Sequence, residues 1–299
     1  MPATKGSPGV DGTTGGRGAL LRAEPGVVPQ KVEVGIREYH AAAGESSSTL
    51  REFTTNRPAY YHRRVLGHRE PESYVREFAL GSAVHALFLE GGAGLTVTTA
   101  PVRGNEFKAL VATCPEVVVP VAVYDVAEEM YASLMKSGIA RQLHPDCAGS
   151  AAESSWVWRD KKTGLDLKVR FDVLMRNGGV DLKTTRNSTP PSFRRRFYEL
   201  RYDIQAGLYL TALRLLGMPE NFYYLVVSSE PPHEVFVYQV DRHEVDFHIE
   251  TTRQVMDEMA RCYASKDAGV WMEPWESRNI LSITPTYIGE PDGKRDDAL

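Results

Sequence analysis

The chain has 299 residues, of which 42% are hydrophobic and 25% charged, enough to bury one sizeable core in a soluble globular protein. Its formal net charge of −4 excludes a protein that coats nucleic acid with its whole surface, because polyphosphate attracts concentrated positive charge. We therefore expect any nucleic-acid site to be local.

Three cysteines, Cys114, Cys147 and Cys262, lie far apart, which excludes CxxC pairs, zinc-finger spacing and an even-numbered disulfide framework. No apolar run approaches the roughly 18 residues that a bilayer requires, and the N-terminus lacks a secretory-signal pattern. We expect reduced thiols, no membrane partner and a cytoplasmic location.

The chain divides into three expected segments. Residues 1–30 are rich in Gly, Pro, Thr and Ala and show no sustained apolar period, a composition typical of a disordered tail. We expect a disordered tail over 1–33, a folded domain over 34–285 and a flexible C-terminal tail over 286–299.

Helical signals come first in the folded domain. Residues 46–48 are serines that can cap a helix beginning near Thr49, and Pro58 disfavours its smooth continuation. Two short helices are therefore expected within 39–66. Apolar residues at helical spacing predict two more helices. The first covers 78–90 and ends at a Gly-Gly pair, and the second covers 123–139.

The period then changes from helical to alternating. Residues 154–159, 165–175 and 180–185 alternate as strands, separated by turns at 161–164 and 177–179. This pattern predicts an antiparallel meander. The remaining expected elements are a helical region over 192–216 with a break near Leu200, a hairpin of 222–229 and 234–240, and a long helix over 245–264.

Together these elements predict an α/β fold with a central mixed β-sheet of about five strands, flanked by α-helices on both faces. We expect the active site at one edge of the sheet.

Two acids lie on neighbouring strands of the meander. Asp172 and Asp181 are separated by the turn at 177–179, so their side chains can converge. Mg²⁺ prefers oxygen ligands and usually takes one or two carboxylates, while a phosphodiester needs a cation and an activated water. Lys183 shares a strand face with Asp181, because side chains alternate, whereas Leu182 points into the opposite layer. Lys183 can therefore orient or deprotonate the attacking water.

Five motifs in order resemble the RecB-like branch of the PD-(D/E)xK nucleases, and especially the RecE-type nuclease domain of exonuclease VIII. Residues 171–172 and 180–185 are similar to the family's metal-binding acid and its DxKT signature, and 202–209 to its QxxxY helix. Residues 81–85 resemble its histidine-bearing helix. Glu153-Ser154 resembles an acid-bearing strand, and 39–50 the start of the domain.

The resemblance implies a restriction-endonuclease-like core and a set of site residues. The implied metal ligands are Asp172, Asp181, the backbone carbonyl of Leu182, His85 and Glu153, and the implied catalytic residues are Asp172, Asp181 and Lys183. Gln205 and Tyr209, four apart on one helix, would contact DNA or hold the active-site strand. No iron-sulfur cluster is expected, because the four cysteines that some relatives use are lacking.

Charge favours the same region. Residues 159–201 contain twelve Lys or Arg against five Asp or Glu, in a chain of net negative charge. The run Arg194, Arg195 and Arg196 follows the candidate catalytic strand and can grip the DNA backbone without reading bases.

The sequence therefore predicts a Mg²⁺-dependent deoxyribonuclease, with Mn²⁺ as an alternative metal, that digests linear double-stranded DNA ends in recombination or repair. In-line attack by a metal-bound water would leave a 5′-phosphate. The resemblance suggests a single-strand annealing protein as partner and a homo-oligomer. Two alternatives stay open: a catalytically inactive DNA-binding module, and an endonuclease of the same fold.

Each candidate also has an ordinary structural interpretation. The two aspartates could form strand-edge ion pairs. His85 could be a hydrogen-bonded core histidine, and Glu153 could cap a strand pair. Gln205 and Tyr209 could serve helix packing, and the three arginines could form a solvated face.

Overall fold

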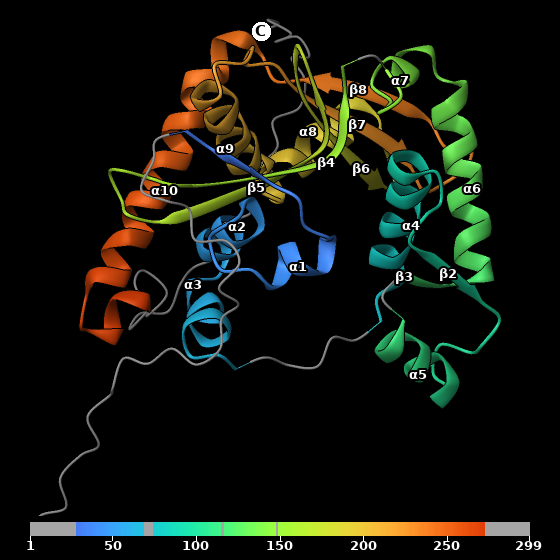
Figure 1. Ribbon diagram of the computed structural model, residues 1–299, viewed down its shortest axis with the longest axis horizontal. Helices are drawn as coiled ribbons and strands as arrows, with labels where there is room; N and C mark the ends of the chain where they lie inside the picture. The colour runs from blue at the N-terminus through green and yellow to red at the C-terminus, as the bar shows by residue number, and fades with distance from the viewer. Residues whose placement is uncertain (1–27, 69–73, 115–116, 148, 273–299) are drawn as a thin grey trace, which may run out of the picture.

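The computed structural model describes residues 28–68, 74–114, 117–147 and 149–272. A six-stranded sheet in the order β1-β4-β5-β6-β7-β8 forms its centre, and helices cover both faces (Figure 1). The β6–β7 pair is parallel and the other neighbours are antiparallel. The predicted α/β architecture around a central mixed sheet is therefore confirmed.

The predicted meander and hairpin are both present, and one further strand joins them. The strands are β1 (Gln30–Val32), β4 (Ala151–Arg159), β5 (Asp166–Met175), β6 (Gly178–Thr185), β7 (Phe222–Ser228) and β8 (Val235–Gln239). Strand β1 lies inside the segment 1–33 that was predicted to be a tail. Its three residues carry no period of their own and are ordered by pairing with β4. Residues 1–27 and 286–299 of the predicted tails lie outside the described residues.

The helices follow the sequence prediction in the second half of the chain and exceed it in the first half. They are α1 (Ile36–Ala41), α2 (Ser47–Thr55), α3 (Arg57–Tyr60), α4 (Arg76–Glu90), α5 (Asn105–Thr113), α6 (Val121–Lys136), α7 (Gly138–Gln142), α8 (Pro190–Glu199), α9 (Tyr202–Leu215) and α10 (Val245–Ala264). The predicted break near Leu200 separates α8 from α9. Among the described helices, none is long and apolar enough to cross a bilayer.

Two further strands form a small lobe, and the sequence did not predict them. Strands β2 (Leu95–Thr98) and β3 (Val117–Pro120) form a parallel two-stranded sheet, and α5 packs beside it through the buried Phe107. Its strands are four residues long, too short to establish an alternating pattern.

Two hydrophobic cores lie on opposite faces of the central sheet. Helices α4 and α6 cover one face, where Leu182 of β6 and Leu225 of β7 are buried. Helices α2, α9 and α10 cover the other, where Tyr224 of β7 is buried. Because β6 alternates, Asp181 and Lys183 point toward the face that α9 covers.

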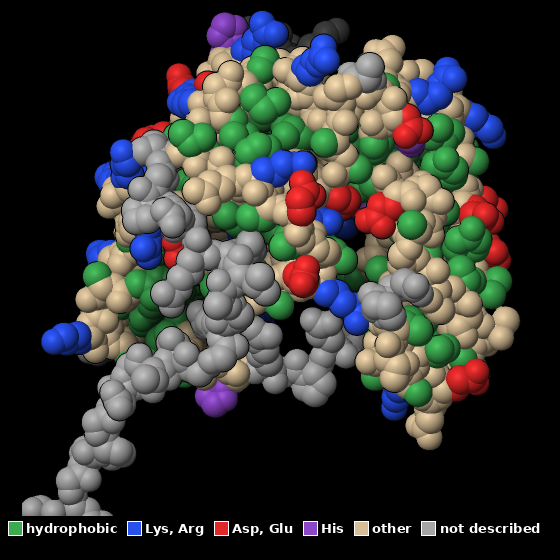
Figure 2. Space-filling view, viewed as in Figure 1, with side chains coloured by type: hydrophobic (Ala, Val, Ile, Leu, Met, Phe, Trp, Pro, Cys, Tyr) green, Lys and Arg blue, Asp and Glu red, His purple; other side chains and the backbone are tan. Residues whose placement is uncertain are grey.

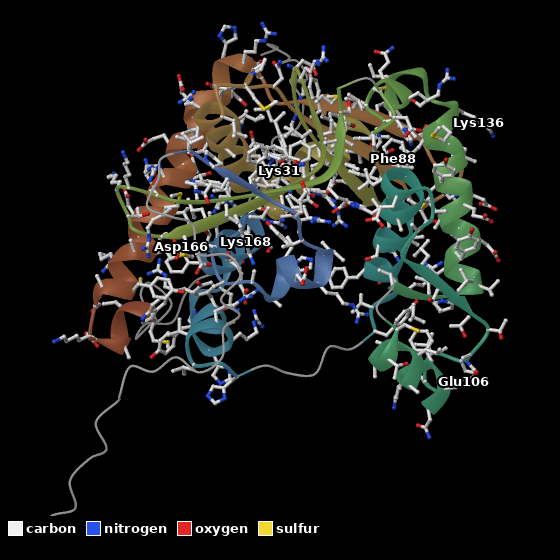
Figure 3. All side chains as sticks on the ribbon, viewed as in Figure 1. Lys31, Phe88, Glu106, Lys136, Asp166 and Lys168 are labelled. Atoms are coloured by element: carbon white, nitrogen blue, oxygen red, sulfur yellow. The ribbon has the colours of Figure 1, made fainter. Side chains whose placement is uncertain are left out.

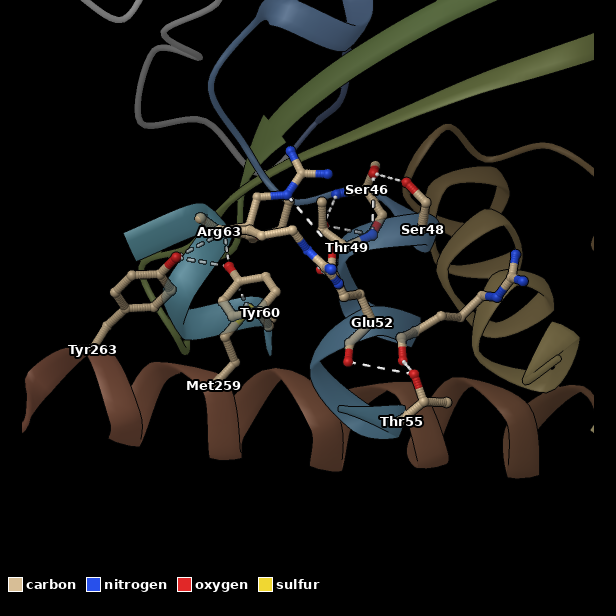
Figure 4. A network of polar contacts seen from close by, with 12 residues as sticks. Ser46, Ser48, Thr49, Glu52, Thr55, Tyr60, Arg63, Met259 and Tyr263 are labelled. Carbon is tan, nitrogen blue, oxygen red and sulfur yellow. Dashed lines mark hydrogen bonds and ion pairs between the residues drawn. The ribbon is translucent and has the colours of Figure 1, made fainter. Parts of the chain in front are cut away.

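Polar contacts join the N-terminal helices to the rest of the fold. The Tyr60 hydroxyl lies 2.7 Å from that of Tyr263 and donates to Glu45 at 2.8 Å, linking α3 to α10 (Figure 4). Lys168 of β5 lies beside these helices (Figure 3), and its ammonium donates to the carbonyls of Tyr39 and Ala42 at 2.7 Å. Burial lowers the pKa of Lys168 to about 8.

Helices α9 and α10 approach closely at Gly207. A Cβ at this position would lie 2.1 Å from both the carbonyl oxygen of His248 and the hydroxyl oxygen of Thr252. Only a residue without a side chain fits there, because one of these atoms belongs to the backbone and cannot rotate away.

We expect Gly207→Ala to lower the free energy of unfolding by about 3 kcal/mol or more, because overpacking a rigid contact forces the helices apart. Chemical denaturation monitored by circular dichroism measures this loss. Gly138→Ala is the matched control, since a Cβ there meets nothing within 4 Å. Equal stability of the two variants would contradict the prediction.

Candidate functional site

The two middle strands of the sheet separate where the candidate acids lie. Strands β5 and β6 pair from Met175–Gly178 to Val173–Val180, and the register ends there. Beyond it, the Leu182 amide donates to the Asp172 carboxylate at 2.6 Å. A side chain thus replaces the backbone ladder and leaves room for polar groups. The predicted position at a sheet edge is corrected: β5 and β6 lie in the middle of the sheet.

The side chains of β5 also switch from one face of the sheet to the other at this point. Phe171 packs against Tyr209 in the core beneath α9, whereas Val173, two residues later, lies in the core beneath α4 and α6. The register of β4 and β5 places Glu153 opposite Asp172. The backbone of Glu153 is left-handed, with a φ of 51°. Such a conformation is costly for a residue with a side chain, and it aims an acid at the site.

Three potential metal ligands converge from three elements. One ligand atom each from His85 of α4, Glu153 of β4 and Asp172 of β5 lie within 4.8 Å of one another. His85 also joins the Leu182 carbonyl to this group, because its Nε2 lies 2.8 Å from that oxygen. The structure therefore brings together four of the five predicted ligands.

The fifth predicted ligand, Asp181, is held by other residues. Its Oδ2 lies 2.5 Å from the Lys183 ammonium, and its Oδ1 accepts a hydrogen bond from the Gln205 amide at 2.5 Å. Asp181 is only 4% exposed. The acid and the lysine of the DxK motif thus form a largely buried ion pair beside the His85 group.

Burial sets the electrostatics of the site. Desolvation raises the pKa of Asp172 to about 7; His85 opposes this shift, while the charges of Asp181 and Glu153 add to it. Burial by itself would lower the pKa of Lys183, but Asp181, Tyr202 and Asp172 together outweigh it and the net shift is upward. Lys183 is therefore a cation at neutral pH, which favours orienting water or phosphate over accepting a proton.

The donor set fits a divalent cation. Carboxylate and carbonyl oxygens with one imidazole nitrogen are ligands that Mg²⁺ or Mn²⁺ accepts. Burial raises the pKa of Asp172, and the charges of Asp181 and Glu153 add to the shift, so a bound cation would stabilise its ionised form. The carboxylate of Glu153 is already engaged by Arg170, which also donates to the Val34 carbonyl at 2.9 Å. Glu153 would therefore share its charge between Arg170 and a metal.

Helix α9 packs against this site on the face of the sheet that it covers. Gln205 and Tyr209 are 4% and 5% exposed, and the Tyr209 hydroxyl donates to the Arg170 carbonyl at 2.7 Å. Of the two roles predicted for this pair, their burial and these hydrogen bonds support holding the active-site strands, and the role as DNA contacts stays a prediction. Arg194, Arg195 and Arg196, by contrast, are exposed on α8.

Sequence reasoning missed two participants. The Arg170 side chain is 10% exposed and pairs with Glu153, a role that was not predicted for it. Its position two residues before Asp172 on the same strand was the available signal. Tyr202 was noted only as part of the QxxxY helix, yet its ring lies 4.9 Å from the Lys183 ammonium.

A family model described as a PDDEXK-like domain of unknown function, DUF3799, matches residues 46–273. The chain belongs to this family. The predicted membership of the PD-(D/E)xK nuclease superfamily is thereby confirmed, and the PDDEXK-like fold points to a nuclease, a hydrolase that acts on nucleic acid.

Solved structures add evidence on the fold. A "putative exonuclease" from Eubacterium rectale is 17% identical, with a TM-score of 0.57 over 77% of this chain and 86% of its own. The protein SSO0001 aligns with 68% of this chain and 86% of its own at 14% identity, but its TM-score of 0.26 is too low to carry an argument. A search of curated proteins finds no match.

The bond from Gln205 to Asp181 is testable through stability. We expect Gln205→Leu to lower the free energy of unfolding by about 1–3 kcal/mol, because a buried carboxylate loses a hydrogen bond. Gln254→Leu, at an exposed position of α10, should change it by about 0.5 kcal/mol or less. Urea denaturation at pH 7 compares them, and equal losses would show that the bond contributes nothing.

The raised pKa of Asp172 predicts a pH dependence of metal-free stability. The folded protein binds more protons than the unfolded chain between the ordinary pKa of 3.8 and about 7. The free energy of unfolding should therefore fall as pH rises through this range. Asp172→Asn removes that fall, so in EDTA the variant should gain stability relative to wild type between pH 5 and 8. Parallel curves for the two proteins would refute the assignment.

Proposed function

We propose that this protein is a metal-dependent exonuclease that hydrolyses phosphodiester bonds at the ends of double-stranded DNA. The observation that carries the proposal is the convergence of two groups on separating strands. The His85–Glu153–Asp172 cluster lies beside the buried Asp181–Lys183 pair, joined to it through Leu182. Neither a packing role nor surface ion pairing explains so many polar groups in this interior.

Each residue has a distinct part in the proposed reaction. The divalent cation would be held by Asp172, His85, Glu153 and the Leu182 carbonyl. Asp181 would be the remaining acid beside the cation. The cation, when bound, supplies charge at the phosphate and lowers the pKa of water. Lys183 carries its proton at neutral pH and would orient the attacking water and neutralise the phosphate. Gln205 keeps Asp181 in place during these steps.

The surface around these elements can receive a nucleic-acid strand. One face is hollowed between helix α1 and helix α4, and both acidic and basic side chains line its margin (Figure 2). The excess of Lys and Arg over Asp and Glu in residues 159–201 supports phosphate binding near these elements. Arg194, Arg195 and Arg196 would contact the backbone, with affinity falling steeply as salt rises.

The preference for exonuclease over endonuclease action rests on likeness. The Eubacterium rectale structure carries the name of an exonuclease, and the sequence motifs resemble exonuclease VIII. The same resemblance supports a role in recombination or repair in the cytoplasm, with a homo-oligomer and a single-strand annealing protein as partner. A 5′-phosphate product follows from in-line attack.

The decisive experiment compares end-labelled linear duplex with closed circular DNA. With Mg²⁺ or Mn²⁺, the wild-type protein should release nucleotides from linear duplex and leave the circle intact, and EDTA should abolish this. Asp181→Asn and Lys183→Met should each lower the rate by about 100-fold or more, because both act at the charge that develops in the transition state. Gln254→Leu serves as the matched control and should retain the wild-type rate.

Other outcomes select the alternatives. Nicking or linearisation of the circle, lost in the same variants, would make the protein an endonuclease. Binding of both DNAs without cleavage in either metal would leave an inactive DNA-binding module.

A further inference from the structure

Arg51 lies on the aromatic ring that the candidate catalytic lysine also contacts. Its guanidinium carbon is 4.8 Å from the centroid of Tyr202, and the Lys183 ammonium is 4.9 Å from the same centroid. The two cations therefore lie within about 10 Å of each other, whichever ring faces they use. Arg51 comes from α2, far from Lys183 in sequence, so the fold has brought them together.

Among the described residues, the charge of Arg51 has no acidic partner. It is half-buried, and its Nε donates to the Leu200 carbonyl at 2.5 Å, but no carboxylate of the described residues forms an ion pair with it. Other enclosed arginines do have one: Arg57 pairs with Glu258, and Arg201 with Asp203. A partly desolvated cation without an anion is costly, so this position favours an anionic ligand.

The contacts of Arg51 also orient it. The Nε bond and the ring together fix the plane of the guanidinium, and the terminal nitrogens keep donors for another group. Tyr202 is itself held, because its ring stacks on Tyr224 at 5.7 Å and its carbonyl accepts from the Tyr224 hydroxyl at 2.8 Å. A planar, pre-oriented guanidinium matches the paired oxygens of a phosphate better than a flexible ammonium does.

We propose that Arg51 binds a backbone phosphate of the substrate strand, near the phosphate that Lys183 contacts, with Tyr202 positioning both cations. Successive phosphates of one strand rise about 3.4 Å along the helix axis, so the separation of the two cations is that of phosphates one or a few nucleotides apart. This inference rests on the proposed function, because it takes the substrate to be a nucleic-acid strand. It adds a residue of α2 to a site so far built from α4, α9 and the sheet.

The test replaces single phosphates of a short linear duplex by uncharged methylphosphonates, one position at a time. Affinity is measured by fluorescence anisotropy in EDTA, which separates binding from cleavage. For the wild type, neutralising the phosphate that Arg51 contacts should weaken binding by about tenfold, the loss expected for one charge-assisted hydrogen bond.

Arg51→Gln should bind the unmodified duplex about tenfold more weakly and show no further loss at that position. Arg51→Lys, which keeps the charge but not the planar fork, should retain part of the sensitivity. Arg63→Gln, at an exposed arginine paired with Glu52, should keep the full wild-type pattern. Thermal melting checks that each variant is folded.

The outcomes distinguish the two proposals. If Arg51→Gln retains the wild-type pattern of sensitivity, or if the wild type binds no duplex, the Arg51 site is overturned. If the pattern depends on Arg51 while the wild type fails to cleave in Mg²⁺ and Mn²⁺, the phosphate site stands and the nuclease function fails. If the wild type cleaves DNA but its binding does not depend on Arg51, the nuclease function stands and the Arg51 site fails.

Discussion

The hydrogen bond from the Leu182 amide to the Asp172 carboxylate is the interaction on which the site depends. It satisfies a backbone donor that the β5–β6 ladder would otherwise pair, and so allows the two middle strands to separate without leaving a buried amide unsatisfied. The separation frees the Leu182 carbonyl for His85 and gives Asp181 space to meet Gln205. A single side chain thus separates β5 from β6 and leaves the polar side chains of the site grouped between them.

The need to balance buried charge explains which residues surround the two aspartates. Three acids, Glu153, Asp172 and Asp181, lie close together in the interior and would repel one another strongly without compensation. Arg170 and Lys183 each neutralise one of them through an ion pair, while Asp172 retains a raised pKa. The remaining imbalance is located where His85 and the carboxylates converge, which is where a divalent cation would reduce it most.

Much of this arrangement follows from local patterns. Asp172, Asp181 and Lys183 were predictable because they share one hairpin, whose turn and alternating period determine their proximity. His85, Glu153 and Gln205 came only from resemblance to known motifs, since nothing local places α4 or α9 against β6. Arg51 and Tyr202 could not be predicted, because their contact depends on how α2 packs on α9. The same limit applies to β1, whose order comes from its partner strand rather than from its own residues.

Helix α9 connects the chemistry to the packing of the far side of the protein. Tyr202, Gln205 and Tyr209 contact Lys183, Asp181 and the strand at Arg170, while Gly207 between them fits against α10. One face of this helix therefore contacts the candidate site, and the other packs against α10. A sequence change on α10 that alters this contact would displace α9, so the two helices should evolve together, with residues 207 and 252 co-varying among relatives.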